Sequence, residues 1–304
     1  MVAYSCLRLE QETSTISCIH VDKRAAVTIH CDLESSLSIN AAAYQPRVGD
    51  VVVCRVLSEH PSYSDLELTS GRMARLKRGD VIAGVLGSRR ALHGFVGEVP
   101  SFLKGGMHVH LLNRGGVIGA CSSSTHQLSE AITLEFLGRV WRDEQALCLT
   151  PGLFGGTSST SFPANLSNSD HVSESPQNFE DIPVIFVAGT CMNSGKTQVA
   201  RELVKHFVHL GQRVAAGKLT GVASLQDTLE MSDQGACITS SFLDFGYPST
   251  IDVANLPIVA KKVLVHLRRA NPQVIVLEMG GGLLDDYGVD VLLGDRELMS
   301  TCSS

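Results

Sequence analysis

The sequence has no excess of positive charge. Lysine and arginine together number 25 against 31 aspartates and glutamates, so the formal net charge is −6 at pH 7, and the isoelectric point is near 6.0. Proteins that bind nucleic acids or anionic membranes broadly favour a basic surface. We therefore expect neither partner, and an anionic ligand has to be held by a local site.

Paired cysteines and long apolar runs are also missing. The nine cysteines are scattered without a C-x-x-C pair, so the pattern indicates no zinc site, and their odd number fits reduced thiols. No apolar run reaches membrane-spanning length, and the N-terminus has no continuous apolar segment typical of a signal peptide. These absences predict a cytoplasmic protein that is not bound to a membrane.

The segment 184–197 is the most informative part of the chain. An apolar run of strand length ends before Gly189, and Gly195-Lys196-Thr197 opens an amphipathic segment, which gives the order strand, loop, helix. Main-chain N–H groups of such a loop bind phosphate oxygens, Lys196 adds a positive charge, and the Thr197 hydroxyl can ligate magnesium. The predicted nucleotide-binding residues here are Gly189, Thr190, Asn193, Ser194, Gly195, Lys196 and Thr197.

The loop departs from the general form G-x-x-x-x-G-K-[ST], which would place glycine at position 190. Its form G-T-x-x-x-x-G-K-T, from Gly189 to Thr197, resembles dethiobiotin synthetase and the related ATP-dependent amidotransferases that make cobyric and cobyrinic acid amides. The segment 274–284, VIVLEMGGGLL, is similar to the E-G-x-G-G strand end of the same group. On this resemblance the chain is a P-loop NTPase of that group with an added N-terminal β domain.

The resemblance implies roles for residues at two further strand ends. Lys218, at the exit of a strand that begins near residue 213, would contact the substrate and the phosphates, and Glu278 would bind magnesium. Gly280 and Gly281 would lie close to the nucleotide and the substrate. The expected catalytic residues are thus Lys196 and Lys218, and the expected cofactors are ATP and Mg²⁺.

A third magnesium-linked residue is implied after the second strand. Asp233, in Ser232-Asp233, matches the aspartate of the group better than Asp227 does, and a helix-capping role for either stays open. The expected metal ligands are Thr197, Asp233 and Glu278.

Two features depart from the group. Asn193 stands where the synthetase has an acidic residue, and Lys218 is followed by leucine where proline is common. The resemblance covers about 182–290, and the chain ends at Ser304, so we expect the parallel sheet to be incomplete at its C-terminal side.

Residues 1–150 are expected to form an all-β domain, either a barrel or a sandwich. Short apolar stretches alternate with glycine and polar turns, and the pattern Arg-Val-Gly-Asp-Val-Val at 47–52 is repeated as Lys-Arg-Gly-Asp-Val-Ile at 77–82, with a fainter copy before 109. Residues 151–180 are rich in serine and poor in bulky apolar residues, which predicts a flexible linker. Residues 181–304 alternate strand and helix patterns, which predicts an α/β domain with a parallel sheet.

The β domain has one basic concentration and three histidines of interest. Aromatic residues for base stacking are sparse around the basic residues, so a solvated face is favoured over a nucleic-acid site. The histidines lack an accompanying carboxylate or cysteine pattern, so ordinary histidines are favoured over metal ligands. The basic residues are Arg72, Arg75, Lys77, Arg78, Arg89 and Arg90, and the histidines are His93, His108 and His110.

The resemblance implies a magnesium- and ATP-dependent ligase or amidotransferase-like enzyme that activates a small carboxylate or carbamate by phosphoryl transfer. Two alternatives stay open. One is a nucleotide-gated regulatory or binding protein in which the second domain switches contacts of the β domain. The other is a transferase whose loop holds the phosphates of an acyl-coenzyme A. The expected partners are a small-molecule substrate and, in a homodimer, a second copy of the chain.

Overall fold

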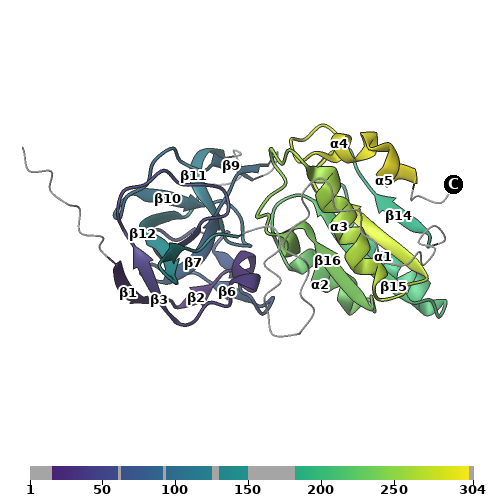
Figure 1. The fold of residues 1–304 in the computed structure, drawn as a ribbon, viewed down its shortest axis with the longest axis horizontal. Helices are drawn as coiled ribbons and strands as arrows, with labels where there is room; N and C mark the ends of the chain where they lie inside the picture. The colour runs from purple at the N-terminus through teal and green to yellow at the C-terminus, as the bar shows by residue number, and fades with distance from the viewer. Residues whose placement is uncertain (1–15, 61–62, 92–93, 125–129, 150–181, 301–304) are drawn as a thin grey trace, which may run out of the picture.

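The computed structural model describes residues 16–60, 63–91, 94–124, 130–149 and 182–300. Two parts lie side by side in Figure 1. We call residues 16–149 the β-rich region and residues 182–300 the α/β region. The expected linker, 151–180, lies outside the described residues, so the domain boundaries stay a prediction.

The β-rich region is built mainly from one sheet. Its pairings run from β12 to β4, β7, β11 and β10, and β10 pairs again with β12. This ring favours the barrel over the sandwich. The strands are β1 (Ile16–His20), β2 (Lys23–Arg24), β3 (Ser36–Asn40), β4 (Val51–Val56), β7 (Val81–Leu86), β8 (Arg89–Arg90), β9 (Phe95–Glu98), β10 (His108–Leu111), β11 (Val117–Ser124), β12 (Thr133–Arg142) and β13 (Gln145–Ala146). A separate pair, β5 (Asp65–Glu67) and β6 (Met73–Arg75), and the 3₁₀ helix η1 (Ala26–Cys31) complete the region.

The repeated Gly-Asp motif forms the same turn before β4 and before β7. Gly49 has φ +96° and Gly79 has φ +94°, a backbone conformation that favours glycine. In the first turn the Asp50 carboxylate accepts from the N–H of Arg47 at 2.9 Å, and in the second Asp80 accepts from the N–H of Lys77 at 2.6 Å. The repeat is therefore a turn-and-strand unit, as its sequence indicates.

The α/β region contains a four-stranded sheet in the order β14-β17-β15-β16, with every pairing parallel. The expected parallel sheet is confirmed. β16 and α2 were not expected, because their segments are short and carry a weak apolar pattern. The elements are β14 (Val184–Val187), α1 (Lys196–His209), β15 (Val214–Thr220), α2 (Gln226–Asp233), β16 (Ile238–Ser241), the 3₁₀ helix η3 (Phe242–Phe245), α3 (Leu256–Arg268), β17 (Val274–Met279), α4 (Val289–Gly294) and α5 (Arg296–Ser300).

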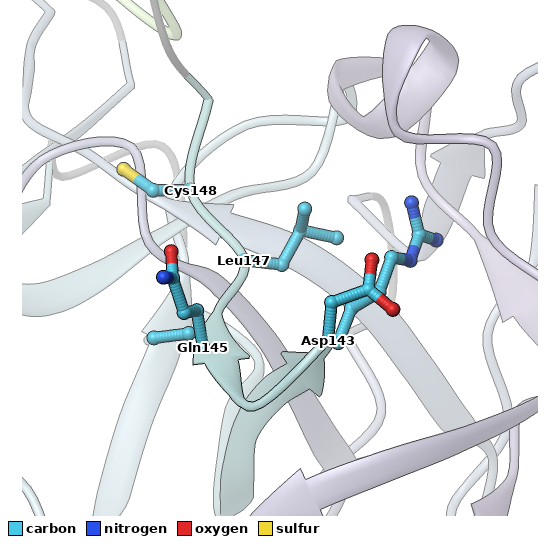
Figure 2. Close-up of a pocket in the computed structure, with 6 residues that line it drawn as sticks. Asp143, Gln145, Leu147 and Cys148 are labelled. Atoms are coloured by element: carbon cyan, nitrogen blue, oxygen red, sulfur yellow. The ribbon is translucent and has the colours of Figure 1, made fainter.

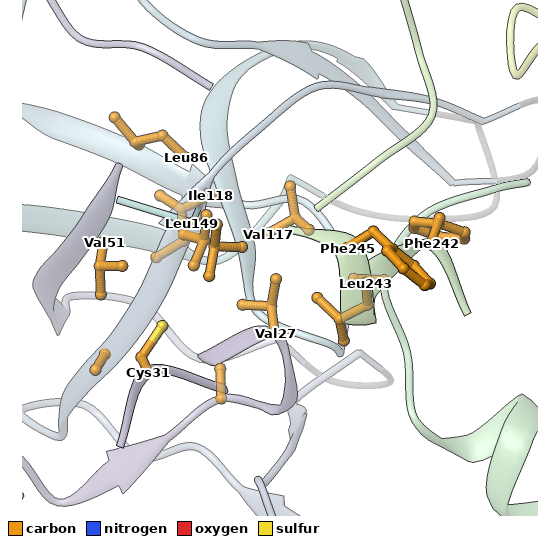
Figure 3. Close-up of a cluster of buried hydrophobic side chains, with 14 of the residues drawn as sticks. Val27, Cys31, Val51, Leu86, Val117, Ile118, Leu149, Phe242, Leu243 and Phe245 are labelled. Atoms are coloured by element: carbon orange, nitrogen blue, oxygen red, sulfur yellow. The ribbon is translucent and has the colours of Figure 1, made fainter. Parts of the chain in front are cut away.

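One hydrophobic core extends across both regions. Phe242, Leu243 and Phe245 of η3 belong to the same buried cluster as Val27 and Val117 of the β-rich region (Figure 3). Burial of large apolar side chains stabilises such a contact by about 1.5–3 kcal/mol each. The largest buried cluster therefore spans the junction, because η3 presents its apolar side chains to the β-rich region, while a smaller cluster in each region lies apart from it.

Among the described residues, no helix is both long enough and apolar enough to traverse a bilayer. The described cysteines are free thiols.

Candidate functional site

The strand order brings three chain segments to one edge of the parallel sheet. β17 lies between β14 and β15, so Glu278 is paired with Val187 on one side and with Lys218 on the other. In an open parallel sheet, ligands bind beyond the carboxyl ends of the strands. The glycine loop after β14, the end of β15 and the end of β17 therefore meet where a ligand is expected.

The loop between β14 and α1 turns sharply at two residues with positive φ. Asn193 has φ +59° and Gly195 has φ +88°. α1 begins at Lys196 and is 14 residues long, and in the described part of the chain no side chain caps its N-terminus. Its first N–H groups are therefore left for another acceptor, and the helix dipole favours an anion there.

The loop after β17 packs tightly on the glycine loop. The N–H of Leu283 donates to the carbonyl of Gly189 at 3.0 Å. A Cβ atom on Gly282 would lie 2.5 Å from the carbonyl oxygen of Thr190, and a Cβ on Gly189 would lie 2.5 Å from Ser194 Oγ. Glycine at these positions therefore allows the two loops to touch, and Gly189 is needed for contacts inside the phosphate loop.

Lys196 lies folded onto the main chain of its own loop. Its Nζ donates to the carbonyl of Cys191 at 2.7 Å and lies 3.4 Å from Ser194 Oγ. Burial lowers the pKa of this lysine, and the negative charge of Glu278 opposes the shift. Phosphate oxygens at the loop would take the place of the Cys191 carbonyl as acceptor for Nζ.

Glu278 is the buried centre of the site, with only 3% of its surface exposed. Thr197 Oγ1 donates to its Oε1 at 2.8 Å, while its Oε2 is shielded and has no hydrogen-bond partner in the described structure. Burial raises the pKa of this carboxyl, and Lys218 opposes the rise. A hydroxyl and a carboxylate oxygen with spare capacity are ligands that suit Mg²⁺, so these two residues fit the expected metal.

Lys218 is buried inside β15 and is not at its exit as expected, because the strand continues to Thr220. It forms an ion pair with Asp227. Burial alone would lower the pKa of this lysine, but the charges of Asp227 and Glu278 outweigh it and raise the pKa. A Cβ on Gly280 would lie 2.8 Å from Lys218 Cε, so that glycine leaves room for the lysine.

Asp227, and not Asp233, is the aspartate that the structure brings to this centre. Asp227 is the second residue of α2, whereas Asp233 is exposed at its last position. They are six positions apart, which is about 9 Å along a helix axis. The expected place of Asp233 beside Glu278 is thus not what the structure shows. Gly281, expected near the substrate, faces Tyr287, whose Cδ2 would lie 2.8 Å from an added Cβ.

Glu67 is a residue of interest that its sequence context did not reveal. It lies at the end of β5 with 1% of its surface exposed. Its Oε2 accepts from Ser224 Oγ at 3.1 Å and from the N–H of Leu225 at 3.0 Å, immediately before α2. Burial raises the pKa of this carboxyl, and these hydrogen bonds oppose the rise. A buried carboxylate of the β-rich region thus holds the start of the helix that carries Asp227.

The expected solvated basic face is found in part: Arg72, Arg75, Lys77 and Arg78 are exposed, whereas Arg89 and Arg90 are not. Arg89 is buried and donates to the carbonyl of Leu112 and to Tyr63 Oη. Arg90 pairs with carboxylates, two of them in the α/β region. Arg90 therefore supports the junction between the regions, whereas these contacts of Arg89 stay within the β-rich region.

A hollow of about 330 Å³ lies at the β12–β13 hairpin (Figure 2). It belongs to the β-rich region and shares no residue with the phosphate loop. Its lining is formed by Arg142, Asp143, Gln145, Ala146, Leu147 and Cys148.

No protein-family model matches the sequence, and no curated protein matches it. Among solved structures, the chain is similar to the 54 kDa signal recognition particle protein of Aeropyrum pernix in complex with GDP, with 15% identity, a TM-score of 0.27, and coverage of 42% of this chain and 26% of that one. It is also similar to the signal recognition particle receptor FtsY of Elizabethkingia anophelis in complex with GDP (20% identity, TM-score 0.29, 40% and 34% covered). A third similar structure is the cell division protein FtsY of Thermotoga maritima, with 21% identity, a TM-score of 0.29, and coverage of 40% of this chain and 38% of that one.

The chain spans about a quarter to two fifths of the length of those structures. TM-scores of 0.27–0.29 are too low for these similarities to indicate the fold or the function of this chain. The P-loop-like character of the α/β region is seen in its own geometry, a glycine loop that joins the first strand of a parallel sheet to a helix beginning with Lys196 and Thr197. The narrower assignment to the dethiobiotin synthetase group is not confirmed.

Proposed function

We propose that this protein is a magnesium- and ATP-dependent enzyme of the ligase or amidotransferase type, which activates a small carboxylate or carbamate by phosphoryl transfer. The observation that carries the proposal is the environment of Glu278. This buried carboxylate accepts a hydrogen bond from the Thr197 hydroxyl, has one oxygen without a partner among the described residues, and is paired in the sheet with Lys218. Burying an incompletely satisfied carboxylate is costly, so a bound cation accounts for its retention.

Each group of the site has a distinct role in this proposal. The first N–H groups of α1 and the loop amides hold the phosphate chain, and Lys196 neutralises its terminal charge. Thr197 and Glu278 would hold magnesium, which when bound offsets the charge on the phosphates. Lys218 stays protonated because its pKa is raised. It therefore offers a fixed positive charge beside Glu278, on the side away from β14 and the phosphate loop.

The proposal is tested by calorimetric titration of Mg-ATP and Mg-GTP into the full chain and into Lys196→Ala. We expect ATP binding in the wild type and its loss in Lys196→Ala, because the phosphate charge loses its partner. Lys205→Ala, an exposed lysine on the same helix, is the matched control and should bind as the wild type does. Unchanged binding in Lys196→Ala would contradict the proposal.

A second candidate function is a nucleotide-gated binding protein, and the contact of Glu67 with the start of α2 favours it. Through that contact, a change at Lys218 and Asp227 would reach the β-rich region. Phosphate release that rises with a small carboxylate or amine would support the enzyme. Tight nucleotide binding with negligible phosphate release would support the gated protein.

A further inference from the structure

A second hollow, of about 320 Å³, lies at the junction of the two regions. One wall comes from β8 and β9 and the other from the segment that follows β17. A space of this size suits a small metabolite. The lining residues are Arg90, Ala91, Val96, Leu284, Asp285 and Asp286.

The hollow adjoins the phosphate loop through the segment 282–285. Leu283 is hydrogen-bonded to Gly189, and the N–H of Asp285 donates to the carbonyl of Gly282, which itself packs on Thr190. The charge of Asp285 also acts on the pKa of Lys196, which it raises against the effect of burial. A molecule in the hollow would therefore contact the segment that packs on the phosphate loop.

The walls of the hollow are held in place without a ligand. Arg90 Nη2 lies 3.1 Å from Glu98 Oε1 and 3.1 Å from Asp252 Oδ2, and Arg90 Nη1 lies 3.2 Å from Asp286 Oδ2. Its main-chain N–H donates to Tyr287 Oη at 3.2 Å, and the Tyr287 side chain is fully buried. Contacts from both regions thus fix the arginine and leave the hollow preformed.

The charges of the lining favour a cation over an anion. The Arg90 guanidinium is already bonded to three carboxylates, so it has little capacity left for an anionic ligand. Asp285 Oδ2, in contrast, is shielded from solvent and has no hydrogen-bond partner in the described structure. With Oδ2 shielded, the rest of the Asp285 carboxylate is the part that a cationic N–H donor in the hollow would meet, and Ala91, Val96 and Leu284 offer apolar contact to an aliphatic chain.

We propose that this hollow binds a small aliphatic molecule with an ammonium or guanidinium group, recognised by Asp285 and Asp286. The binding itself is independent of the proposed function. Its role as the nitrogen-bearing substrate of a ligase rests on that function.

The test is calorimetric titration of the nucleotide-free full chain with cadaverine and agmatine, and with glutarate as a dicarboxylate of similar length. We expect saturable binding of at least one of the two cations at one site and none of glutarate. Asp285→Asn should weaken that binding at least about tenfold, because a charge-assisted hydrogen bond is lost. Asp286→Asn is the second variant and should also weaken it, and thermal melting checks that each variant is folded.

Asp290→Asn is the matched control, since Asp290 is exposed on α4 and does not line the hollow. Its affinity for the cation should equal that of the wild type. The proposal is overturned if neither cation binds saturably, if glutarate binds equally well, or if a folded Asp285→Asn binds with unchanged affinity. Mg-ATP binding is measured in a separate titration. If the wild type binds Mg-ATP but neither cation, only the proposed cation site is refuted. If it binds a cation but not Mg-ATP, only the proposed function is refuted.

Discussion

At the scale of single residues, the site depends on close packing around Lys218. Gly280 has no unusual backbone angle that would require glycine, yet a Cβ there would lie 2.3 Å from the carbonyl oxygen of Thr220 and 2.8 Å from Lys218 Cε. The first of these atoms is main chain and cannot move aside without shifting β15. The requirement for glycine is therefore steric, and it protects the position of the lysine.

We expect Gly280→Ala to lower the free energy of unfolding by about 1–3 kcal/mol, which is typical of overpacking in a buried site, and to weaken Mg-ATP binding because Lys218 is displaced. Urea denaturation and calorimetry measure the two effects. Gly294→Ala is the control, since an added Cβ there meets no atom within 4 Å and alanine favours a helix. A stability of Gly280→Ala equal to that of Gly294→Ala would contradict the steric argument.

At the scale of elements, helix α2 links the two regions. Its second residue, Asp227, pairs with Lys218, and the residues just before it, Ser224 and Leu225, bond to Glu67 of the β-rich region. A carboxylate at a helix start also interacts favourably with the helix dipole. The position of Asp227 against Lys218 is thus set in part by a residue outside the α/β region.

Glu67→Ala should lower the free energy of unfolding by about 1–3 kcal/mol, because hydrogen bonds to a buried carboxylate are lost and the N–H of Leu225 is left without its acceptor. It should also speed amide hydrogen exchange at Leu225. Glu34→Ala, an exposed glutamate of the same region, serves as the control. Slow exchange that persists at Leu225 in Glu67→Ala would show that other contacts hold the helix start.

The features that the sequence predicts correctly are those encoded by residues close together in the chain. The strand, glycine loop and helix around Lys196 and the two Gly-Asp turns are each encoded within a few residues, and the structure has them. Glu67 is 158 residues from Leu225, so no pattern along the chain could pair them. For the same reason the choice of Asp227 over Asp233 depended on knowing where α2 begins, which its weak apolar pattern does not reveal.

At the scale of the whole molecule, the two regions are joined by apolar packing and by polar contacts at η3. The Asp244 carboxylate, in η3, lies 2.8 Å from His30 Nε2 of the β-rich region, and it accepts from Ser240 Oγ at 2.7 Å and from the N–H of Ser241 at 2.8 Å. Burial would raise the pKa of Asp244, but these hydrogen bonds outweigh it and hold the pKa below the ordinary aspartate value.

This shift predicts how the stability of the protein depends on pH. An aspartate with a depressed pKa stabilises the folded state above its unfolded value of about 3.9, and the stabilisation is lost as the pH falls through the folded value. Asp244→Asn should therefore be about 2 kcal/mol less stable than the wild type near pH 6, since hydrogen bonds to a charged group are lost. The difference should shrink below about pH 4 and vanish once the wild-type carboxyl is protonated.

Urea denaturation of both proteins between about pH 3 and pH 6 measures this difference. Asp252→Asn is a useful comparison, because Asp252 also reaches across the junction, to Arg90, but its side chain is 73% exposed and such pairs contribute about 0–1 kcal/mol. If Asp244→Asn and Asp252→Asn lose the same small stability at every pH, the polar contact at η3 does not hold the regions together. The shared apolar core would then be sufficient to join them.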